Sequence, residues 1–192
     1  GKREEMTSYS PAERDRLARV FAAIASDAGV AVMDVYQSDF ETRIKADRSP
    51  VSDADEKAEE IILARLASDL PGVAVLAEER VAREGLGAAI TGDFLLVDPV
   101  DGTKEFIQRK GDFTVNIALI SGGRPVAGCV YAPARKEMYF GGASARLIEA
   151  FEPGSKVGDG RVLATRDYPS GGLVAITSSS HLNEETRKFI AR

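Results

Sequence analysis

Two aspartates, Asp98 and Asp101, stand three residues apart directly after an apolar run, and this spacing could hold a divalent cation. The run at 93–97 is rich in Phe, Leu and Val and is predicted to be a strand with Asp98 at its carboxyl end. Pro99 has a fixed φ and no amide donor, so we expect it to stop the strand and force a tight turn. Such a turn can bring both carboxylates and the Val100 carbonyl toward one point. Oxygen-only ligands of this kind suit Mg²⁺.

The residues after this turn could hold an anion. Gly102 lets the backbone come close to a ligand, and 103–108 is predicted to be a short helix whose free amides point back toward the turn. Metal and phosphate would then share one pocket. The segment also fits an ordinary surface turn, in which both carboxylates are solvated and Thr103 caps the helix. Taken alone, it does not decide between these interpretations.

A second apolar run also ends in acidic residues. The run at 73–77 is predicted to be a strand, and Glu78 and Glu79 follow it directly. Two strands that both deliver carboxylates from their carboxyl ends can build a shared site. Glu78 is the stronger candidate of the two glutamates.

A third acidic segment, Ser-Pro-Val-Ser-Asp-Ala-Asp at 49–55, opens a predicted helix. One face of that helix is apolar and consists of Ala58, Ile61, Ile62 and Leu66. Ser52 and Asp55 have the spacing of a capping box, so Asp55 can simply stabilise the helix start. An aspartate at a helix start can also serve chemistry, and both roles stay open.

Three segments, in this order, resemble the inositol monophosphatase-like family of Mg²⁺-dependent, lithium-sensitive phosphatases. They are 49–55, Leu-Ala-Glu-Glu at 76–79 and Val-Asp-Pro-Val-Asp-Gly-Thr-Lys-Glu-Phe at 97–106. The chain looks closest to the bacterial 3′(2′),5′-bisphosphate nucleotidases of that family. Lys-Glu-Phe stands where inositol monophosphatases usually carry Thr-Asn-Phe, and Phe-Thr-Val-Asn-Ile-Ala at 113–118 has the same likeness.

The resemblance implies a role for each candidate position. The implied metal ligands are Glu78, Asp98, the Val100 carbonyl and Asp101. The implied substrate-binding groups are the amides of Gly102 and Thr103, with Lys104 and, more weakly matched, Lys45. Thr103 and Asp55 would orient and deprotonate the attacking water with Glu78 close by, and Glu79 would support the ligands from outside.

The resemblance also implies a reaction, the release of phosphate and AMP from 3′-phosphoadenosine 5′-phosphate. Two or three Mg²⁺ ions would assist and Li⁺ would inhibit. Metal ions about 3.5–4 Å apart lower the barrier to phosphate ester hydrolysis, and a chain with one His and one Cys has few other catalysts. Inositol 1-phosphate is the main alternative substrate, and fructose 1,6-bisphosphate is a weaker one. A protein that binds metal or phosphate without turnover is the alternative of another class.

One departure from the family concerns the second half of the chain. The family supplies a further metal-binding aspartate there from a Trp-Asp segment, but this sequence has no Trp and stops at Arg192. We therefore expect a metal- and phosphate-binding domain at 1–152, a linker, and the incomplete start of a second α/β domain at 161–192, with doubtful activity in isolation. In that second unit we expect a strand at 173–177 and a helix from about 184. Ser179 replaces an arginine common in nucleotidases, and His181 is given no catalytic role.

The remaining elements indicate an α+β fold. Ser10-Pro11 starts a predicted helix with a long apolar stripe: Leu17, Val20, Phe21, Ile24, Ala28, Val32 and Val35. The segments 114–120 and 125–131 are predicted to pair as a β-hairpin, and 137–140 continues the sheet. The expected architecture is the family's layered α/β sandwich, an antiparallel sheet flanked by helices.

Composition narrows the function classes. The chain has 192 residues, 44% of them hydrophobic, and a net charge of −5, which argues against a nucleic-acid polymer as partner. No apolar stretch approaches the roughly 20 residues of a transmembrane helix. The lone Cys129 is expected to be a buried thiol in a reducing compartment. We therefore expect a cytoplasmic protein, with peripheral association with the inner membrane and pairing into a homodimer left open.

Two other phosphate or metal motifs are excluded by spacing. A haloacid-dehalogenase phosphatase uses Asp-x-Asp-x-Thr, whereas two residues separate Asp98 from Asp101. An EF-hand needs acidic or amide residues at alternating positions, and the segment from Asp53 fails at the third ligand.

Overall fold

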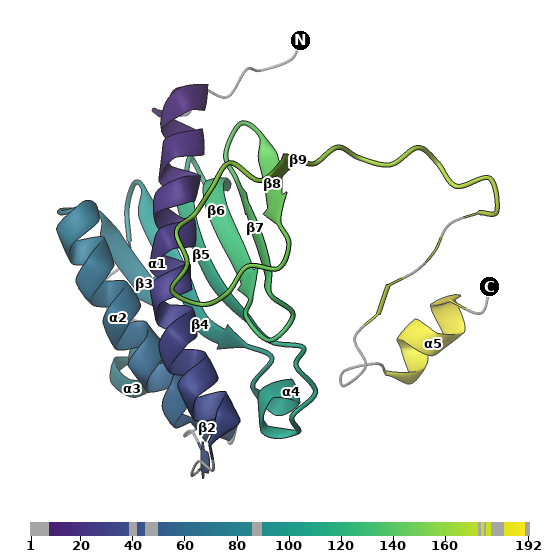
Figure 1. Cartoon of the computed structure of the whole chain (residues 1–192), viewed down its shortest axis with the longest axis horizontal. Coiled ribbons are helices and arrows are strands. Elements are labelled where there is room, and N and C mark those ends of the chain that lie inside the picture. The colour runs from purple at the N-terminus through teal and green to yellow at the C-terminus, as the bar shows by residue number, and fades with distance from the viewer. Residues whose placement is uncertain are drawn as a thin grey trace.

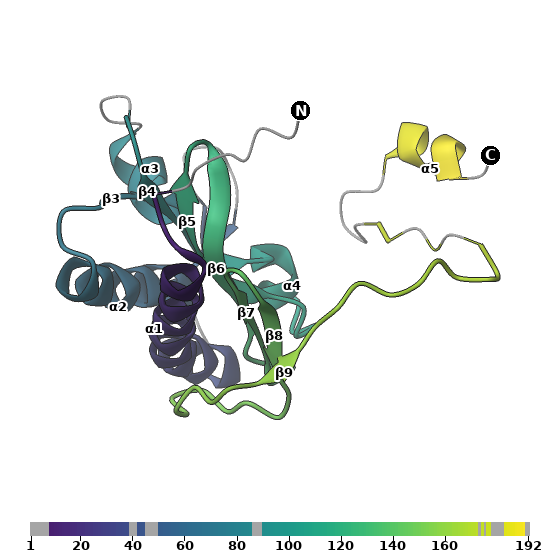
Figure 2. The ribbon, with the colours of Figure 1, turned by 90° about the horizontal axis from the view of Figure 1, so that it is seen from above.

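The structure, a computed structural model, describes residues 8–38, 42–44, 50–85, 90–172, 174, 176–177 and 183–190, without the side chains of 42–44 and 50–52. The elements in chain order are α1 (Pro11–Gln37), β1 (Thr42–Ile44), β2 (Pro50–Ser52), α2 (Asp53–Asp69), β3 (Ala74–Ala77), α3 (Glu78–Glu84), β4 (Phe94–Asp101), α4 (Thr103–Ile107), β5 (Thr114–Ser121), β6 (Arg124–Ala132), β7 (Glu137–Gly141), β8 (Ala145–Ile148), β9 (Arg161–Val162) and α5 (Glu184–Ile190). The helices α1 and α2 lie side by side on one face of a sheet (Figure 1; Figure 2).

The sheet formed by the described residues has seven strands in the order β3-β4-β5-β6-β7-β8-β9. β3 runs parallel to β4, and every other neighbouring pair is antiparallel. The predicted α+β class and helix-flanked sheet are confirmed, with the parallel edge strand as a refinement. The predicted hairpin is also confirmed, because β5 and β6 pair across a short turn at 122–123.

One strand end differs from the prediction. Pro99 does not stop β4, which runs on to Asp101. Asp98 pairs with Asn116, and the next pair in the ladder is Asp101 with Thr114, so the ladder is irregular between the two aspartates. Pairing therefore resumes after the interruption, because a bulge can absorb residues that lack ladder bonds without ending the strand.

The long helix α1 begins where the sequence indicates. The Ser10 hydroxyl accepts the amide of Glu13, and the Glu13 carboxylate accepts the amide of Ser10, which completes a capping box with Pro11 in the first turn. The predicted apolar stripe is buried, with only Val20 half-buried. In α2, the apolar face is likewise buried apart from the half-buried Ile61. An ion pair between Arg65 and Asp27 joins the two helices.

The sheet has one packed face and one open face. Along β5 every second residue is buried, and residues such as Val115, Ile117 and Leu119 are 1% exposed or less. The alternate positions belong to the opposite face. Cys129 is 4% exposed, which fits the predicted core thiol, and burial raises the pKa of this thiol to about 12.

The segment after β8 crosses α1 before it returns to the sheet. The Ser26 hydroxyl donates to the Ser155 carbonyl at 3.0 Å, and the Gly154 amide donates to the Ser26 carbonyl at 3.1 Å. The strand β9 at 161–162 then pairs with β8, so the first residues beyond the predicted linker belong to the same sheet. The proposed division into domains stays a prediction.

The last described helix lies apart from the sheet in both views (Figure 1; Figure 2). It is the helix expected from 184, and the Asn183 side chain caps it by accepting the Thr186 amide at 2.8 Å. Of the predicted strand at 173–177, residues 174, 176 and 177 are described and lie in no strand; the rest lie outside the described residues. None of the described helices is long and apolar enough to cross a membrane.

Candidate metal and phosphate site

The carboxyl ends of β3 and β4 place two acidic residues at the same level. Ala77 pairs with Val97 in the parallel register. Glu78 directly follows Ala77, the last residue of β3, and Asp98 directly follows Val97 in β4. Glu78 is exposed and begins α3, whereas Asp98 is half-buried. Adjacent parallel strands thus bring the two predicted metal ligands to the edge of the sheet at which the carboxyl ends of β3 and β4 lie.

The turn after β4 is stabilised by a hydrogen bond between two of its own residues. The Thr103 hydroxyl donates to the Val100 carbonyl at 3.2 Å, and the Phe106 amide donates to the Gly102 carbonyl at 2.9 Å. The side chain of Val100 is 1% exposed, so its carbonyl is fixed by packing as well as by this hydrogen bond. Asp101, an exposed residue, lies between these groups.

Gly102 occupies a conformation and a space that no other residue fits without strain. Its φ is 93° and its ψ is 38°, in the left-handed region. A Cβ at this position would lie 2.7 Å from the Asp112 carbonyl oxygen and 3.3 Å from the Phe113 Cα, both backbone atoms. The glycine therefore permits the turn and the close approach of the segment before β5.

A cluster of three aromatic rings packs α4 against the end of α1 and the segment before β5. The Tyr36 ring lies 5.1 Å from the Phe106 ring and 4.8 Å from the Phe113 ring, and the two phenylalanines are 4.8 Å apart edge to face. Phe106 and Phe113 are buried. Arg109 extends the contact, because its guanidinium lies 5.3 Å from the Tyr36 ring centroid and donates to the Ser38 carbonyl. The end of α1 thus fixes the helix that begins with Thr103.

Asn116 belongs to this site although sequence reasoning gave it no role. It faces Asp98 across the β4–β5 ladder, and its amide nitrogen lies 3.5 Å from the Asp101 carboxylate. Its side-chain oxygen is buried and accepts no hydrogen bond from the described residues. The sequence shows a polar residue on the open face of the predicted strand. Its partner on the neighbouring strand is known only once the register is known.

Asp55 and Glu59 stand one turn apart on α2, and both are buried, at 0% and 2% exposure. One Glu59 oxygen accepts the amides of Glu79 and Arg80 at 2.9 and 3.1 Å, so Glu59 caps α3 from a neighbouring helix. Burial raises the pKa of Glu59, while these amides and Arg83 act in the opposite direction. Sequence reasoning missed Glu59, because nothing local connects it with residues 20 positions later.

Lys104 and Glu79 are the remaining predicted site residues that the structure describes. Lys104 is exposed on α4, and Glu79 is 5% exposed behind Glu78. The side chains of Lys45, Ser179 and His181 lie outside the described residues, as does that of Ser52. Within the part of the chain that the structure describes, no three His, Cys, Asp or Glu side chains are grouped so as to hold a metal ion.

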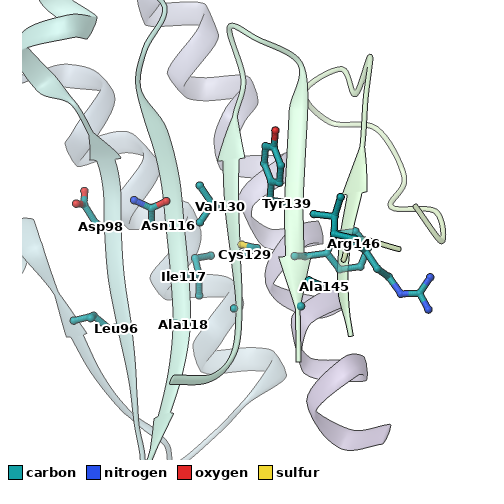
Figure 3. A pocket seen from close by; sticks show the side chains of 14 residues that line it. Leu96, Asp98, Asn116, Ile117, Ala118, Cys129, Val130, Tyr139, Ala145 and Arg146 are labelled. Carbon is teal, nitrogen blue, oxygen red and sulfur yellow. The ribbon is translucent and has the colours of Figure 1, made fainter. Parts of the chain in front are cut away.

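A hollow of about 550 Å³ opens on the sheet face away from α1, beside Asp98 and Asn116 (Figure 3). Most of its lining is apolar and comes from β4 to β8, with Leu163 after β9. Leu96 and Val130, which line it, are 43% and 45% exposed. Asp98 and Asn116 lie at one side of this hollow, and Arg146 lies at the opposite side (Figure 3).

This fold and site define a class. A sequence model of the inositol monophosphatase family matches residues 13–188, and the chain belongs to that family. The structure is similar to that of CysQ from Bacteroides thetaiotaomicron, a bacterial member of the same family. That likeness has a TM-score of 0.68 and 34% identity and covers 92% of this chain and 68% of that one.

Two curated relatives narrow the likeness. The 3′(2′),5′-bisphosphate nucleotidase CysQ of Salmonella typhimurium is 38% identical over 169 residues, which cover 87% of this chain and 65% of the relative. The chloroplastic bifunctional phosphatase IMPL2 of Arabidopsis thaliana is 33% identical and covers 98% of this chain and 52% of the relative. The predicted resemblance is confirmed. The chain spans less than two thirds of the length of these relatives.

Proposed function

We propose that this chain carries the metal and phosphate site of a Mg²⁺-dependent phosphomonoesterase that acts on 3′(2′),5′-bisphosphate nucleotides. The observation that carries the proposal is the register of β3 and β4, which places Glu78 level with Asp98. The turn that follows adds Asp101, the Val100 carbonyl and the Gly102–Thr103 amides to the same edge.

The donor chemistry of this edge fits magnesium. The candidate ligands offer carboxylate and carbonyl oxygens, and the buried oxygen of Asn116 adds one acceptor to the same edge. The proposed ligands are Glu78, Asp98, Val100 and Asp101. When bound, a divalent ion would neutralise phosphate charge and make water a better nucleophile.

The chain's own residues would do the rest of the work. The amides of Gly102 and Thr103 would hold the phosphate oxygens, and Lys104 and Lys45 would add positive charge. Thr103 and Asp55 would hold the attacking water and accept its proton, with Glu78 beside them. The buried position of Asp55 suits a carboxylate that must stay in one orientation.

Two features favour a nucleotide as the substrate. The relative from Salmonella typhimurium is named a 3′(2′),5′-bisphosphate nucleotidase, and the Lys-Glu-Phe sequence at 104–106 stands directly after the phosphate-binding turn. The proposed products are AMP and phosphate from 3′-phosphoadenosine 5′-phosphate. Inositol 1-phosphate is the second candidate substrate, and binding without turnover is the second class of function. A cytoplasmic location is proposed because the single cysteine is a buried free thiol.

Phosphate release tests the proposal. We would measure release from 3′-phosphoadenosine 5′-phosphate and from inositol 1-phosphate with Mg²⁺, with and without Li⁺, for this chain and for the complete natural protein. Faster, lithium-sensitive release from the nucleotide supports the proposal. Faster release from inositol 1-phosphate changes the substrate, and metal binding without release from either compound supports the binding-only alternative.

A further inference from the structure

The helix α3 does not cap its own start. Its N-cap residue is Ala77, which has no side chain able to accept a hydrogen bond, and no cap bond forms from that position. The amides of Glu79 and Arg80 instead donate to one oxygen of Glu59, in the middle of α2. A helix start that depends on a distant residue is placed by that residue.

The charge of Glu59 suits this position. A carboxylate at a helix N-terminus is stabilised by the exposed amides and by the helix dipole, and such charge-assisted hydrogen bonds are stronger than neutral ones. The other Glu59 oxygen lies 3.7 Å from the Arg83 guanidinium, one turn further along α3. Glu59 is only 2% exposed, so its carboxylate has little access to water and depends on these protein donors instead.

Glu78 is fixed from two sides as a result. On one side, the pairing of Ala77 with Val97 sets its level relative to Asp98. On the other side, Glu59 holds the two residues that follow Glu78. Asp55 stands four residues before Glu59, on the same face of α2, so one helix face carries both the candidate base and the anchor of the candidate ligand.

We propose that Glu59 is a positioning residue, whose carboxylate sets where Glu78 stands relative to Asp98 and Asp55. This inference rests on the proposed metal site but does not depend on which phosphate ester is the substrate. Its loss should weaken metal binding first, because the ligand would remain present but poorly placed. Outer residues that orient metal ligands typically contribute roughly 10–100-fold to affinity.

The test compares Glu59→Ala, Glu59→Gln and the control Glu60→Ala in the complete natural protein. Glu60 is the next residue on α2 and is exposed. Binding of Mn²⁺, used as a probe for Mg²⁺, would be measured by titration calorimetry without substrate. The Mg²⁺ concentration for half-maximal phosphate release and the thermal unfolding midpoint would be measured alongside.

We expect Glu59→Ala to weaken Mn²⁺ binding and to raise the Mg²⁺ requirement roughly tenfold or more. Glu59→Gln, which keeps an acceptor oxygen but loses the charge-assisted hydrogen bonds, should weaken Mn²⁺ binding measurably but less than Glu59→Ala does, and Glu60→Ala should match the unchanged protein. A folded Glu59→Ala protein with unchanged Mn²⁺ affinity overturns the inference. If Glu59→Ala does not fold, Glu59→Gln decides, and an affinity identical to that of the unchanged protein then overturns it.

The two proposals fail in different ways. Mn²⁺ binding that depends on Glu59, without phosphate release from any tested ester, would leave the positioning role standing and remove the proposed reaction. Normal phosphate release with Mn²⁺ affinity insensitive to Glu59 would do the reverse. Absence of Mn²⁺ binding by the unchanged protein would overturn the metal site and the inference together.

Discussion

The two segments that bring acidic residues to the sheet edge are held in different ways. The turn from Asp98 to Thr103 has stabilising features of its own, the hydrogen bond from the Thr103 hydroxyl and the left-handed Gly102, and the helix that follows packs on Tyr36 of α1. The start of α3 at Glu78 is fixed from outside, by Glu59. The hydrogen bond within this self-held turn joins residues three apart in the chain, whereas the position of Glu78 depends on how α2 packs.

The largest expected effect is in the self-held turn. Asp98→Asn should lower turnover roughly 1,000-fold, because a neutral amide cannot replace the charge that would hold the proposed cation, whose contribution to such reactions is several kcal/mol. Glu78→Gln should cost less, since its segment is more exposed. Asp93→Asn, just before the start of the same strand, is the control. Phosphate release measures the effect, and equal turnover in Asp98→Asn and Asp93→Asn would remove the metal assignment.

A second comparison separates backbone conformation from close packing. Gly102→Ala and Gly122→Ala both force a residue with a Cβ into positive φ, at 93° and 58°, which costs about 1–2 kcal/mol. At Gly122 the added Cβ meets nothing within 4 Å, but at Gly102 it meets the Asp112 carbonyl. The loss in free energy of unfolding should therefore be at least about 1 kcal/mol larger for Gly102→Ala. Denaturant unfolding measures both losses. Equal losses would show that the segment before β5 moves away from residue 102 without cost.

A smaller effect is expected from the hydroxyl of Thr103. Thr103→Ala should lower kcat roughly tenfold to a hundredfold while changing Mg²⁺ affinity less, because the hydroxyl would orient water as well as hold the Val100 carbonyl. Thr103→Ser keeps the hydroxyl and is the control. Steady-state kinetics at several Mg²⁺ concentrations distinguish the two contributions. A loss confined to Mg²⁺ affinity would assign Thr103 a purely structural role.

The smallest effect is expected far from the turn, at Cys129. Burial raises the pKa of this thiol to about 12, so at pH 8 the folded protein should react with a thiol reagent far more slowly than the unfolded chain. The folded state then binds the proton more tightly than the unfolded state, so this group's stabilisation is lost as the pH rises from about 9 toward 12. Comparison with Cys129→Ala isolates the contribution. Rapid labelling of the native protein would contradict the burial.

Local patterns in the sequence predicted the longer helices and most of the central strands, but not α3, β8 or β9 and not the register. The helix start at Ser10-Pro11, the hairpin and the acidic residues after two strands could all be predicted from neighbouring residues. The pairing of Asn116 with Asp98 and the cap that Glu59 gives to α3 could not, because each joins residues far apart in the chain. Pro99 misled for a related reason: its missing donor ends a regular ladder, but β5 accommodates the bulge and continues the pairing.

The hydrogen bond from Thr103 to the Val100 carbonyl has an evolutionary consequence. A carbonyl oxygen is present whatever side chain the residue carries, so position 100 can change among apolar residues of similar size without removing a donor atom. Mutation could remove this proposed ligand only indirectly, by altering the turn that holds it. Comparison of side chains alone would therefore miss this proposed ligand.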